Sequence, residues 1–260
     1  MSMKKRLAWM LSSLTVALAA AALIGFFSST RAADPKPIKA LLITGGCCHD
    51  YPYQTEKLTA YSKQSAGIAW TVVNEGGRGT KAKIKLYDDP KWAEPYDVVV
   101  HNECFANTKD PAYIRKILAA HKAGKPAVVI HCAMHTYRAA KIDDWREFLG
   151  VTSKHHEHQS RYPVKVTAPD HPILTNFPKE GWTTPKDELY VVTKVWPNTK
   201  ILATSRSERT KKDHAVFWTN TYGKGRVFGT TYGHSKGTFA DPVFLETVTR
   251  GALWAAGRLD

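Results

Sequence analysis

The sequence predicts an α/β fold with a mainly parallel central sheet and an antiparallel extension, and two observations predict it. In the first half, continuous runs of Val, Ile and Leu alternate with amphipathic stretches of helical spacing. That texture is typical of a parallel sheet covered on both faces. In the second half, shorter strand-like segments follow one another with turn residues between them. This favours antiparallel pairing.

The first half contains alternating predicted strands and helices. Pro111 suits the first turn of a helix, and Gly124 suits the end of the same helix. A Gly- and Lys-rich stretch at 75–83 predicts a loop. The predicted strands are 38–44, 68–74, 96–102 and 126–132, and the predicted helices are 53–66 and 111–124.

The second half contains mainly predicted strands. A short helix is expected at 143–149, and a helix at 242–257 closes the chain. Residues 222–225 predict a hairpin loop between the last two strands. The polar HHEH run at 155–158 lacks hydrophobic framing and favours a solvated loop; the alternative is that one of its three histidines folds over the site. The predicted strands are 162–168, 189–195, 200–205, 214–220 and 225–233.

Residues 1–32 have the features of a secretory signal peptide. A basic start at 4–6 precedes an apolar run at 7–27, and small residues precede a cleavage site before Ala33. Cleavage leaves one domain at 33–260, exported to the periplasm or the extracellular space. The alternative is an uncleaved membrane anchor, for which the apolar run is long enough. No segment after the leader is expected to span a bilayer.

The chain is basic, with a formal net charge of +14. Because the lysines are spread evenly, without a compact basic run and interleaved aromatics, a nucleic-acid partner is not expected. The glycines near Gly45 form neither a dinucleotide nor a phosphate-binding motif, so no nucleotide cofactor is expected.

Three histidines, His49, His131 and His234, stand where a predicted strand gives way to a loop. In open α/β sheets the ligand crevice lies outside the carboxyl ends of the strands. His135 follows His131 at a spacing that binds metal on a helix, although the accompanying glutamate of the HExxH motif is missing. We therefore expect a divalent ion such as zinc on His49, His131 and His135. The alternative is one functional histidine and one that bonds the backbone.

Two acids also follow strands, and each has two interpretations. Asp50 either orients an imidazole or caps the following helix. Glu103 is either a general acid or base or the partner of a lysine. His171 precedes a proline and is expected to be structural.

Four cysteines, Cys47, Cys48, Cys104 and Cys132, fall at predicted strand ends. They are either small buried thiols or include one disulfide from the adjacent pair to Cys104 or Cys132.

An ordered set of motifs resembles the ThuA-like (trehalose utilisation) family: LLITGG with HD, DVVV, the strand ending at His131, DHPI, WTNTYGKGRVFGTTYGH and the final LWAAG. The resemblance implies a class I glutamine-amidotransferase-like fold, which is a flavodoxin-like three-layer sandwich. It also implies a role in the metabolism of trehalose or of glucosides processed through keto-sugars. Amidotransferase activity itself is not expected, because Cys132 lacks the flanking glycines of the strained nucleophile turn.

The main hypothesis is an exported enzyme that acts on a small-molecule sugar by histidine acid/base or metal-assisted chemistry. Its catalytic residues are His131, His234 and Glu103. Its sugar-binding residues are Asp50, Tyr137, Arg138, Trp145 and Lys236, and the alternative for the two aromatics is ordinary packing in the core. One alternative is a sugar-binding module without turnover. Another is a hydrolase with Cys132 as nucleophile and His234 as base. The sequence indicates no oligomeric state.

Overall fold

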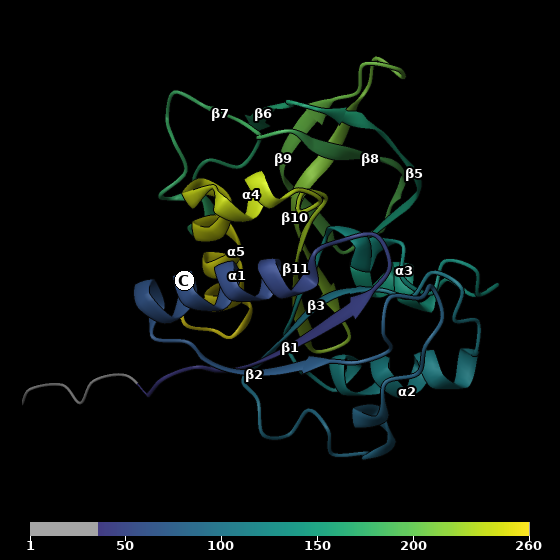
Figure 1. Ribbon diagram of the computed structural model, residues 1–260. Helices are drawn as coiled ribbons and strands as arrows, with labels where there is room; N and C mark the ends of the chain where they lie inside the picture. Colours follow the sequence, from purple (N-terminus) through teal and green to yellow (C-terminus); the bar gives the residue numbers. More distant parts are fainter. Residues whose placement is uncertain (1–35, 260) are drawn as a thin grey trace, which may run out of the picture. The chain divides into compact units, whose positions relative to one another are not determined.

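A nine-stranded sheet forms the centre of the fold (Figure 1). The computed structural model describes residues 36–259, so the predicted leader at 1–32 lies outside the described residues. The strand order is β2-β1-β3-β4-β11-β10-β9-β6-β7, and β5 and β8 form a separate two-stranded sheet. The strands are β1 (Lys39–Gly46), β2 (Ala69–Asn74), β3 (Val98–Cys104), β4 (Ala127–Ile130), β5 (Val151–Ser160), β6 (Pro163–Val166), β7 (Trp182–Thr183), β8 (Asp187–Val195), β9 (Thr199–Arg206), β10 (Asp213–Tyr222) and β11 (Gly225–Thr230).

The strands β2, β1, β3, β4 and β11 run parallel, as the apolar runs predict. Nearly all residues of β1, β3 and β4 are buried, because helices cover both faces. The carboxyl ends of β1, β3, β4 and β11 therefore meet at one edge. We call this edge the rim, and it consists of residues 45–50, 103–105, 131–135 and 231–235.

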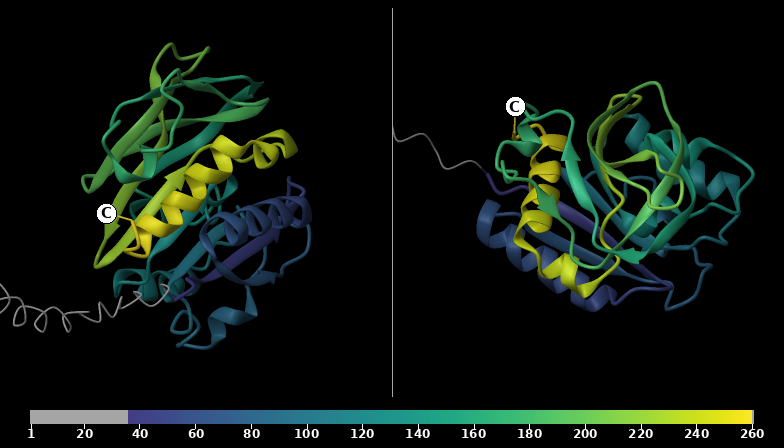
Figure 2. Two further views of the ribbon diagram at one scale, coloured as in Figure 1. Left: turned by 90° about the vertical axis from the view of Figure 1, so that its left-hand side faces the viewer. Right: turned by 90° about the horizontal axis from the view of Figure 1, so that it is seen from above.

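Helices cover the two faces of the sheet, which confirms the three-layer prediction (Figure 2). Leu58 of α1 and Phe244 of α5 pack in the core on one face. Ile114 of α2 and Phe148 of α3 pack in the core on the other. No helix within residues 36–259 is both long and apolar enough to cross a membrane. The helices are α1 (Tyr51–Ala66), α2 (Pro111–Lys122), α3 (Asp144–Leu149), α4 (Lys236–Ala240) and α5 (Pro242–Ala255), with 3-10 helices η1 (Lys85–Asp88), η2 (His131–Met134) and η3 (Pro172–Leu174).

The antiparallel extension begins at the predicted hairpin between β10 and β11, and it continues through β9 and β6 to β7. The hairpin turn needs Gly223, whose φ is +58°, because a Cβ there would lie 2.3 Å from the carbonyl oxygen of Lys122. The close approach fixes the hairpin against the end of α2.

The prediction of a solvated loop at 155–158 is wrong. These residues lie in β5, which pairs antiparallel with β8 and places His156 opposite Tyr190. The strand lacks an apolar alternation because residues 154–156 are exposed, while Glu157 is buried and receives a hydrogen bond from Ser207. Long-range pairing with β8, rather than local pattern, therefore creates the strand.

Candidate functional site

Three histidines from distant parts of the sequence meet at the rim. His49 follows β1, His131 follows β4 and His234 follows β11. The ring centroids lie 4.9 Å apart for His49 and His131, 4.8 Å for His49 and His234, and 5.4 Å for His131 and His234. One ring nitrogen of each lies within 4.8 Å of the others. We call these residues the histidine cluster, and the structure brings together the three histidines that the sequence places at strand ends.

The tautomer of His131 is set by the backbone. Its Nδ1 lies 2.6 Å from the carbonyl oxygen of Thr231. Since a carbonyl only accepts, Nδ1 carries the proton and Nε2 keeps its lone pair. That Nε2 lies 3.3 Å from the Tyr190 hydroxyl. Burial lowers the pKa of His131 well below its usual value, so the ring is neutral and able to bind a metal through Nε2.

His49 is the least satisfied member of the cluster. Both of its ring nitrogens are buried, and neither has a hydrogen-bond partner among the described residues. Burial, and then the nearby His234, lower the pKa of His49 to about 3. The turn before it requires Gly46, whose φ is +100° and whose Cβ would lie 2.3 Å from the carbonyl oxygen of Cys104. The backbone at Gly46 therefore packs directly against the end of β3, and this turn places the neutral, unpartnered ring of His49 at the rim.

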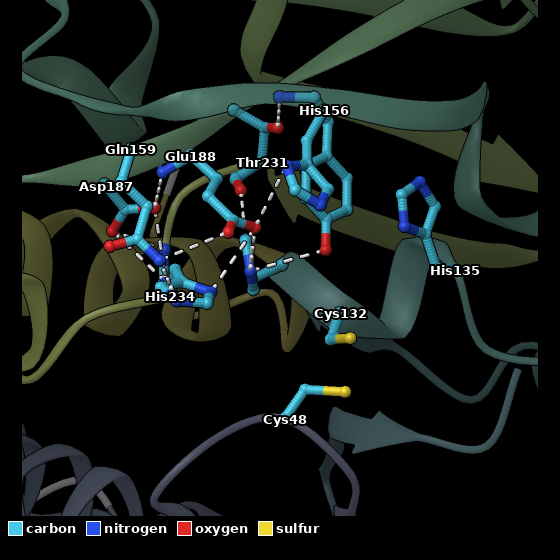
Figure 3. Close-up of polar contacts among 12 residues, drawn as sticks. Cys48, Cys132, His135, His156, Gln159, Asp187, Glu188, Thr231 and His234 are labelled. Carbon is cyan, nitrogen blue, oxygen red and sulfur yellow. Dashed lines mark hydrogen bonds and ion pairs between the residues drawn. The ribbon is translucent and has the colours of Figure 1, made fainter. Parts of the chain in front are cut away.

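Glu188 of β8 is a carboxylate that sequence reasoning missed (Figure 3). Its Oε2 lies 3.3 Å from His234 Nδ1, 3.7 Å from His131 Nε2 and 3.5 Å from His156 Nδ1. The side chain is 9% exposed. Pairing between β5 and β8 carries Glu188 to the cluster, so the acid faces two of its three members.

The turn that carries His234 is held by Asp187 and Gln159 (Figure 3). The buried carboxylate of Asp187 accepts the backbone N–H groups of Gly233 and His234, each at 3.2 Å, and the hydroxyl hydrogen of Thr238. Burial raises the pKa of Asp187. The Gln159 amide lies 2.7 Å from His234 Nε2. Both ring nitrogens of His234 thus face polar groups from the β5–β8 sheet.

A cavity of about 600 Å³ opens in front of His49 and His234. Its wall includes the cations Arg78 and Lys236, and Lys236 lies 2.8 Å from the Asp50 carboxylate. Its other lining residues are Gly45, Gly46, Cys48, Tyr51, Pro52, Gln54, Asn74 and Gly77. Few of these side chains are apolar, so the cavity suits a ligand rich in hydroxyl groups.

The structure does not place His135 in the histidine cluster. The residue ends η2 rather than lying one turn along an α-helix. Its ring stacks on Tyr190 with centroids 4.1 Å apart, and Tyr190 also contacts His131. The tyrosine therefore separates the two histidines, and His234 takes the place in the cluster that was predicted for His135.

Three predicted sugar-binding residues lie away from the cavity. Tyr137 and Trp145 are 1% and 2% exposed and pack in the core beneath η2. Arg138 lies beside His135, with Nη1 3.4 Å from its Nδ1. By contrast, Asp50 and Lys236 do line the cavity, and Asp50 also caps α1 by accepting the Tyr53 N–H at 3.2 Å.

Glu103 lies outside the histidine cluster, in a buried network of its own. Its Oε1 is 3.0 Å from His101 Nδ1, and His101 Nε2 is 3.1 Å from His121 Nε2. His121 Nδ1 donates to the carbonyl oxygen of Lys125 at 2.9 Å. Among the described residues the Glu103 carboxylate thus bonds a histidine rather than a lysine. Glu103 and His101 therefore form a buried structural pair rather than part of the histidine cluster.

The four cysteines form two disulfides, Cys47–Cys48 and Cys104–Cys132. Both expectations for the cysteines are therefore wrong. The adjacent cysteines pair with each other rather than with Cys104 or Cys132, and none of the four is a free thiol. In this form Cys132 has no free thiol, which removes the nucleophile of the predicted cysteine hydrolase.

The histidine cluster fits a divalent ion. Imidazole nitrogens bind zinc at about 2.0–2.1 Å, and three such ligands with one open position are typical of catalytic zinc sites. Burial keeps His49 and His131 neutral, as ligands must be. The Thr231 carbonyl orients His131 as the outer partners of metal ligands do. The unpartnered nitrogens of His49 are the donors that such an ion would satisfy.

A family model described as trehalose utilisation (ThuA) matches residues 44–255. No curated protein sequence matches the chain. Among solved structures, the chain is similar to a ThuA-like protein from Parabacteroides merdae, with 24% identity and a TM-score of 0.71, over 86% of this chain and 92% of the other. A ThuA-like protein from Bacteroides uniformis has 17% identity and a TM-score of 0.64, over 86% and 94%. A cytoplasmic protein from Salmonella typhimurium has 14% identity and a TM-score of 0.55, over 84% and 98%. These structural likenesses concern the fold.

Proposed function

The chain belongs to the ThuA family, which is connected with trehalose utilisation, and we propose that it is an enzyme acting on a glucoside or keto-sugar at the histidine cluster. The observation that carries the proposal is the unpartnered His49 between His131 and His234 at the edge of a polar cavity. Buried polar atoms without partners are costly, and they concentrate at sites that await a ligand.

We propose that the three histidines hold a divalent ion such as zinc. When bound, such an ion supplies Lewis acidity that polarises a sugar carbonyl or hydroxyl. His131 would use Nε2, because Nδ1 is committed to the Thr231 carbonyl. Because the lowered pKa keeps the His49 ring neutral, the ring need not lose a proton before it binds the ion.

Glu188 is the residue placed to accept a proton. Its Oε2 lies beside His131 and His234, and the side chain is 9% exposed, so water competes weakly for the carboxylate. The reaction class it supports is removal of a proton from a carbon next to a sugar carbonyl, or from a hydroxyl. A positioned acid or base of this kind contributes about 10²–10⁴ in rate. Glu188 thus takes the role that the sequence assigned to Glu103.

The cavity wall is suited to bind sugar hydroxyls. Asp50 accepts hydrogen bonds, while Lys236 and Arg78 donate them, so the wall matches groups that both donate and accept. Tyr51 adds an aromatic side chain to the wall. We propose that Asp50, Lys236 and Arg78 bind the sugar, and that the reaction takes place at His49, His234 and Glu188.

Two variants separate the metal from the proton acceptor. We expect wild-type protein to hold about one zinc per chain, as measured by elemental mass spectrometry. His49→Gln should lose both the metal and turnover of keto-glucosides, while Glu188→Gln should keep the metal and lose turnover. His135→Gln is the matched control, because it changes a buried histidine outside the cluster. Full metal and full activity in His49→Gln would sink the proposal, and sugar binding without turnover in wild type would favour a binding module.

Export through the predicted leader is part of the same proposal. The two disulfides accord with an oxidising compartment. N-terminal sequencing of the protein recovered from a cell envelope fraction should begin at Ala33. Recovery of the full-length chain from the membrane would instead support the uncleaved anchor.

A further inference from the structure

Two disulfides touch each other at the rim, and the function proposed above uses neither of them. We call Cys47, Cys48, Cys104 and Cys132 the cysteine cluster. The Sγ atom of Cys47 lies 3.7 Å from the Sγ atom of Cys104, so one sulfur of the adjacent pair contacts one sulfur of the Cys104–Cys132 bond. Thiol–disulfide exchange proceeds by attack of one sulfur on another, for which such a contact is the starting geometry.

Exposure differs sharply across the cysteine cluster. Cys48 is exposed and lines the cavity, and Cys47 is half-buried. Cys104 and Cys132 are only 3% and 6% exposed. A small thiol in solvent therefore reaches Cys48 easily and the inner disulfide poorly. Exchange rates depend on this access.

We propose that the cysteine cluster is a thiol–disulfide exchange site, in which the Cys47–Cys48 pair passes reducing equivalents from a small dithiol to the buried Cys104–Cys132 disulfide. Cys48 is the entry point because it faces the cavity. Cys47 is the donor to the interior because its Sγ lies 3.7 Å from the Sγ of Cys104, whereas the Sγ of Cys48 lies within 4.8 Å of it and also faces the cavity.

The steps balance in atoms and electrons. A thiolate of the dithiol attacks Cys48 Sγ, the Cys47–Cys48 bond breaks, and Cys47 leaves as a thiolate. The second thiol of the reductant closes its own disulfide and frees Cys48. The Cys47 thiolate then attacks Cys104 Sγ, which forms Cys47–Cys104 and releases Cys132 as a thiolate that takes up a proton.

A last exchange completes the transfer. Cys48 attacks Cys47 Sγ, re-forms the adjacent disulfide and releases Cys104 as a thiol. The net reaction moves two electrons and two protons from the dithiol to Cys104 and Cys132. Because Cys48 directly precedes His49 and His131 directly precedes Cys132, the exchange changes bonds beside two members of the histidine cluster.

A matched pair of variants tests the relay. Cys48→Ser and Cys47→Ser each remove the adjacent disulfide and leave one thiol, but only Cys48→Ser leaves the Cys47 sulfur that lies 3.7 Å from Cys104 Sγ. Each protein is kept in EDTA, labelled with N-ethylmaleimide and mapped as non-reduced peptides. We expect Cys48→Ser to yield a peptide linking Cys47 to Cys104 and a labelled Cys132. We expect Cys47→Ser to keep Cys104–Cys132 and to be labelled at Cys48. Intact Cys104–Cys132 in both variants would overturn the proposal.

Wild-type protein gives an independent measurement that needs no variant to fold. During limited reduction with dithiothreitol, the Cys47–Cys104 peptide should appear before complete reduction, and loss of the adjacent disulfide should precede loss of Cys104–Cys132. Reduction of Cys104–Cys132 should be about tenfold slower or more in Cys47→Ser than in wild type. Equal rates, or reduction of the inner disulfide first, would refute the relay. None of these measurements depends on a metal or on turnover.

Discussion

Replacing His49 with leucine is expected to stabilise the metal-free protein while it abolishes metal binding. The two ring nitrogens of His49 are buried without hydrogen-bond partners. A buried polar group left in this state costs about 1–3 kcal/mol, whereas an apolar side chain of similar size does not carry that cost. The ring also contacts Tyr51 and the other two histidines, and leucine loses part of that packing. We therefore expect a net gain of about 1–2 kcal/mol in the free energy of unfolding.

The assay is urea unfolding followed by tryptophan fluorescence near neutral pH, first with EDTA and then with zinc. Wild type should gain about 2.7 kcal/mol at a zinc concentration about 100 times the Kd, and His49→Leu should gain nothing from this site. His171→Leu is the control. Its Nδ1 accepts the Ile173 N–H at 3.3 Å, so the substitution should destabilise the protein with or without zinc. A His49→Leu protein that is less stable than wild type in EDTA, or that zinc stabilises equally, would refute the reasoning.

Three further predictions concern the buried groups around the site. Burial lowers the pKa of His121 to about 3, so below pH about 6.5 the unfolded chain binds a proton that the folded chain does not. The free energy of unfolding therefore decreases as the pH decreases from about 7 to 5. His121→Gln should make this decrease smaller by about 2 kcal/mol, as measured by urea unfolding at both pH values. Glu103→Gln should keep most of the stability, because an amide still bonds His101, whereas Glu103→Ala should lose about 3 kcal/mol or more in the same unfolding assay; equal losses would contradict this. Gly46→Ala should lower the free energy of unfolding by about 3 kcal/mol or more in the same assay, because its Cβ would meet a backbone carbonyl oxygen at 2.3 Å; a near-neutral effect would show that the turn can open.

The sequence was sufficient to predict the parallel half of the fold and the positions of the three clustered histidines. Buried Val and Ile runs identify central strands locally, and the carboxyl ends of parallel strands must share one edge. His49, His131 and His234 could therefore be expected at that edge from their order alone. Their distances and the orphaned nitrogens of His49 could not, because these depend on φ angles and packing that no pattern encodes.

The residues that sequence reasoning missed depend on antiparallel pairing at long range. Glu188 reaches the cluster because β8 pairs with β5, and β5 is a polar strand without the alternation that marks strands locally. Asp187 and Glu188, which directly precede the apolar run at 189–195, were the sequence signal for this carboxylate. Tyr137 and Trp145 failed as cavity residues for a related reason. The chain turns back into the core after η2, so aromatics close to His131 in sequence lie beneath the rim.

Two groups of buried histidines show why one of them is assigned the function. All four ring nitrogens of His101 and His121 have partners: a carboxylate, a carbonyl oxygen and each other. The ring nitrogens of that network are all satisfied, and of its polar atoms only Oε2 of Glu103 lacks a partner among the described residues. The ring nitrogens of His49 have none, and the φ of +45° at His131 strains the backbone at the same edge. A fold that satisfies the ring nitrogens of His101 and His121, and leaves both of those of His49 and Nδ1 of His234 without hydrogen-bond partners beside a cavity, concentrates its cost where a ligand can offset it.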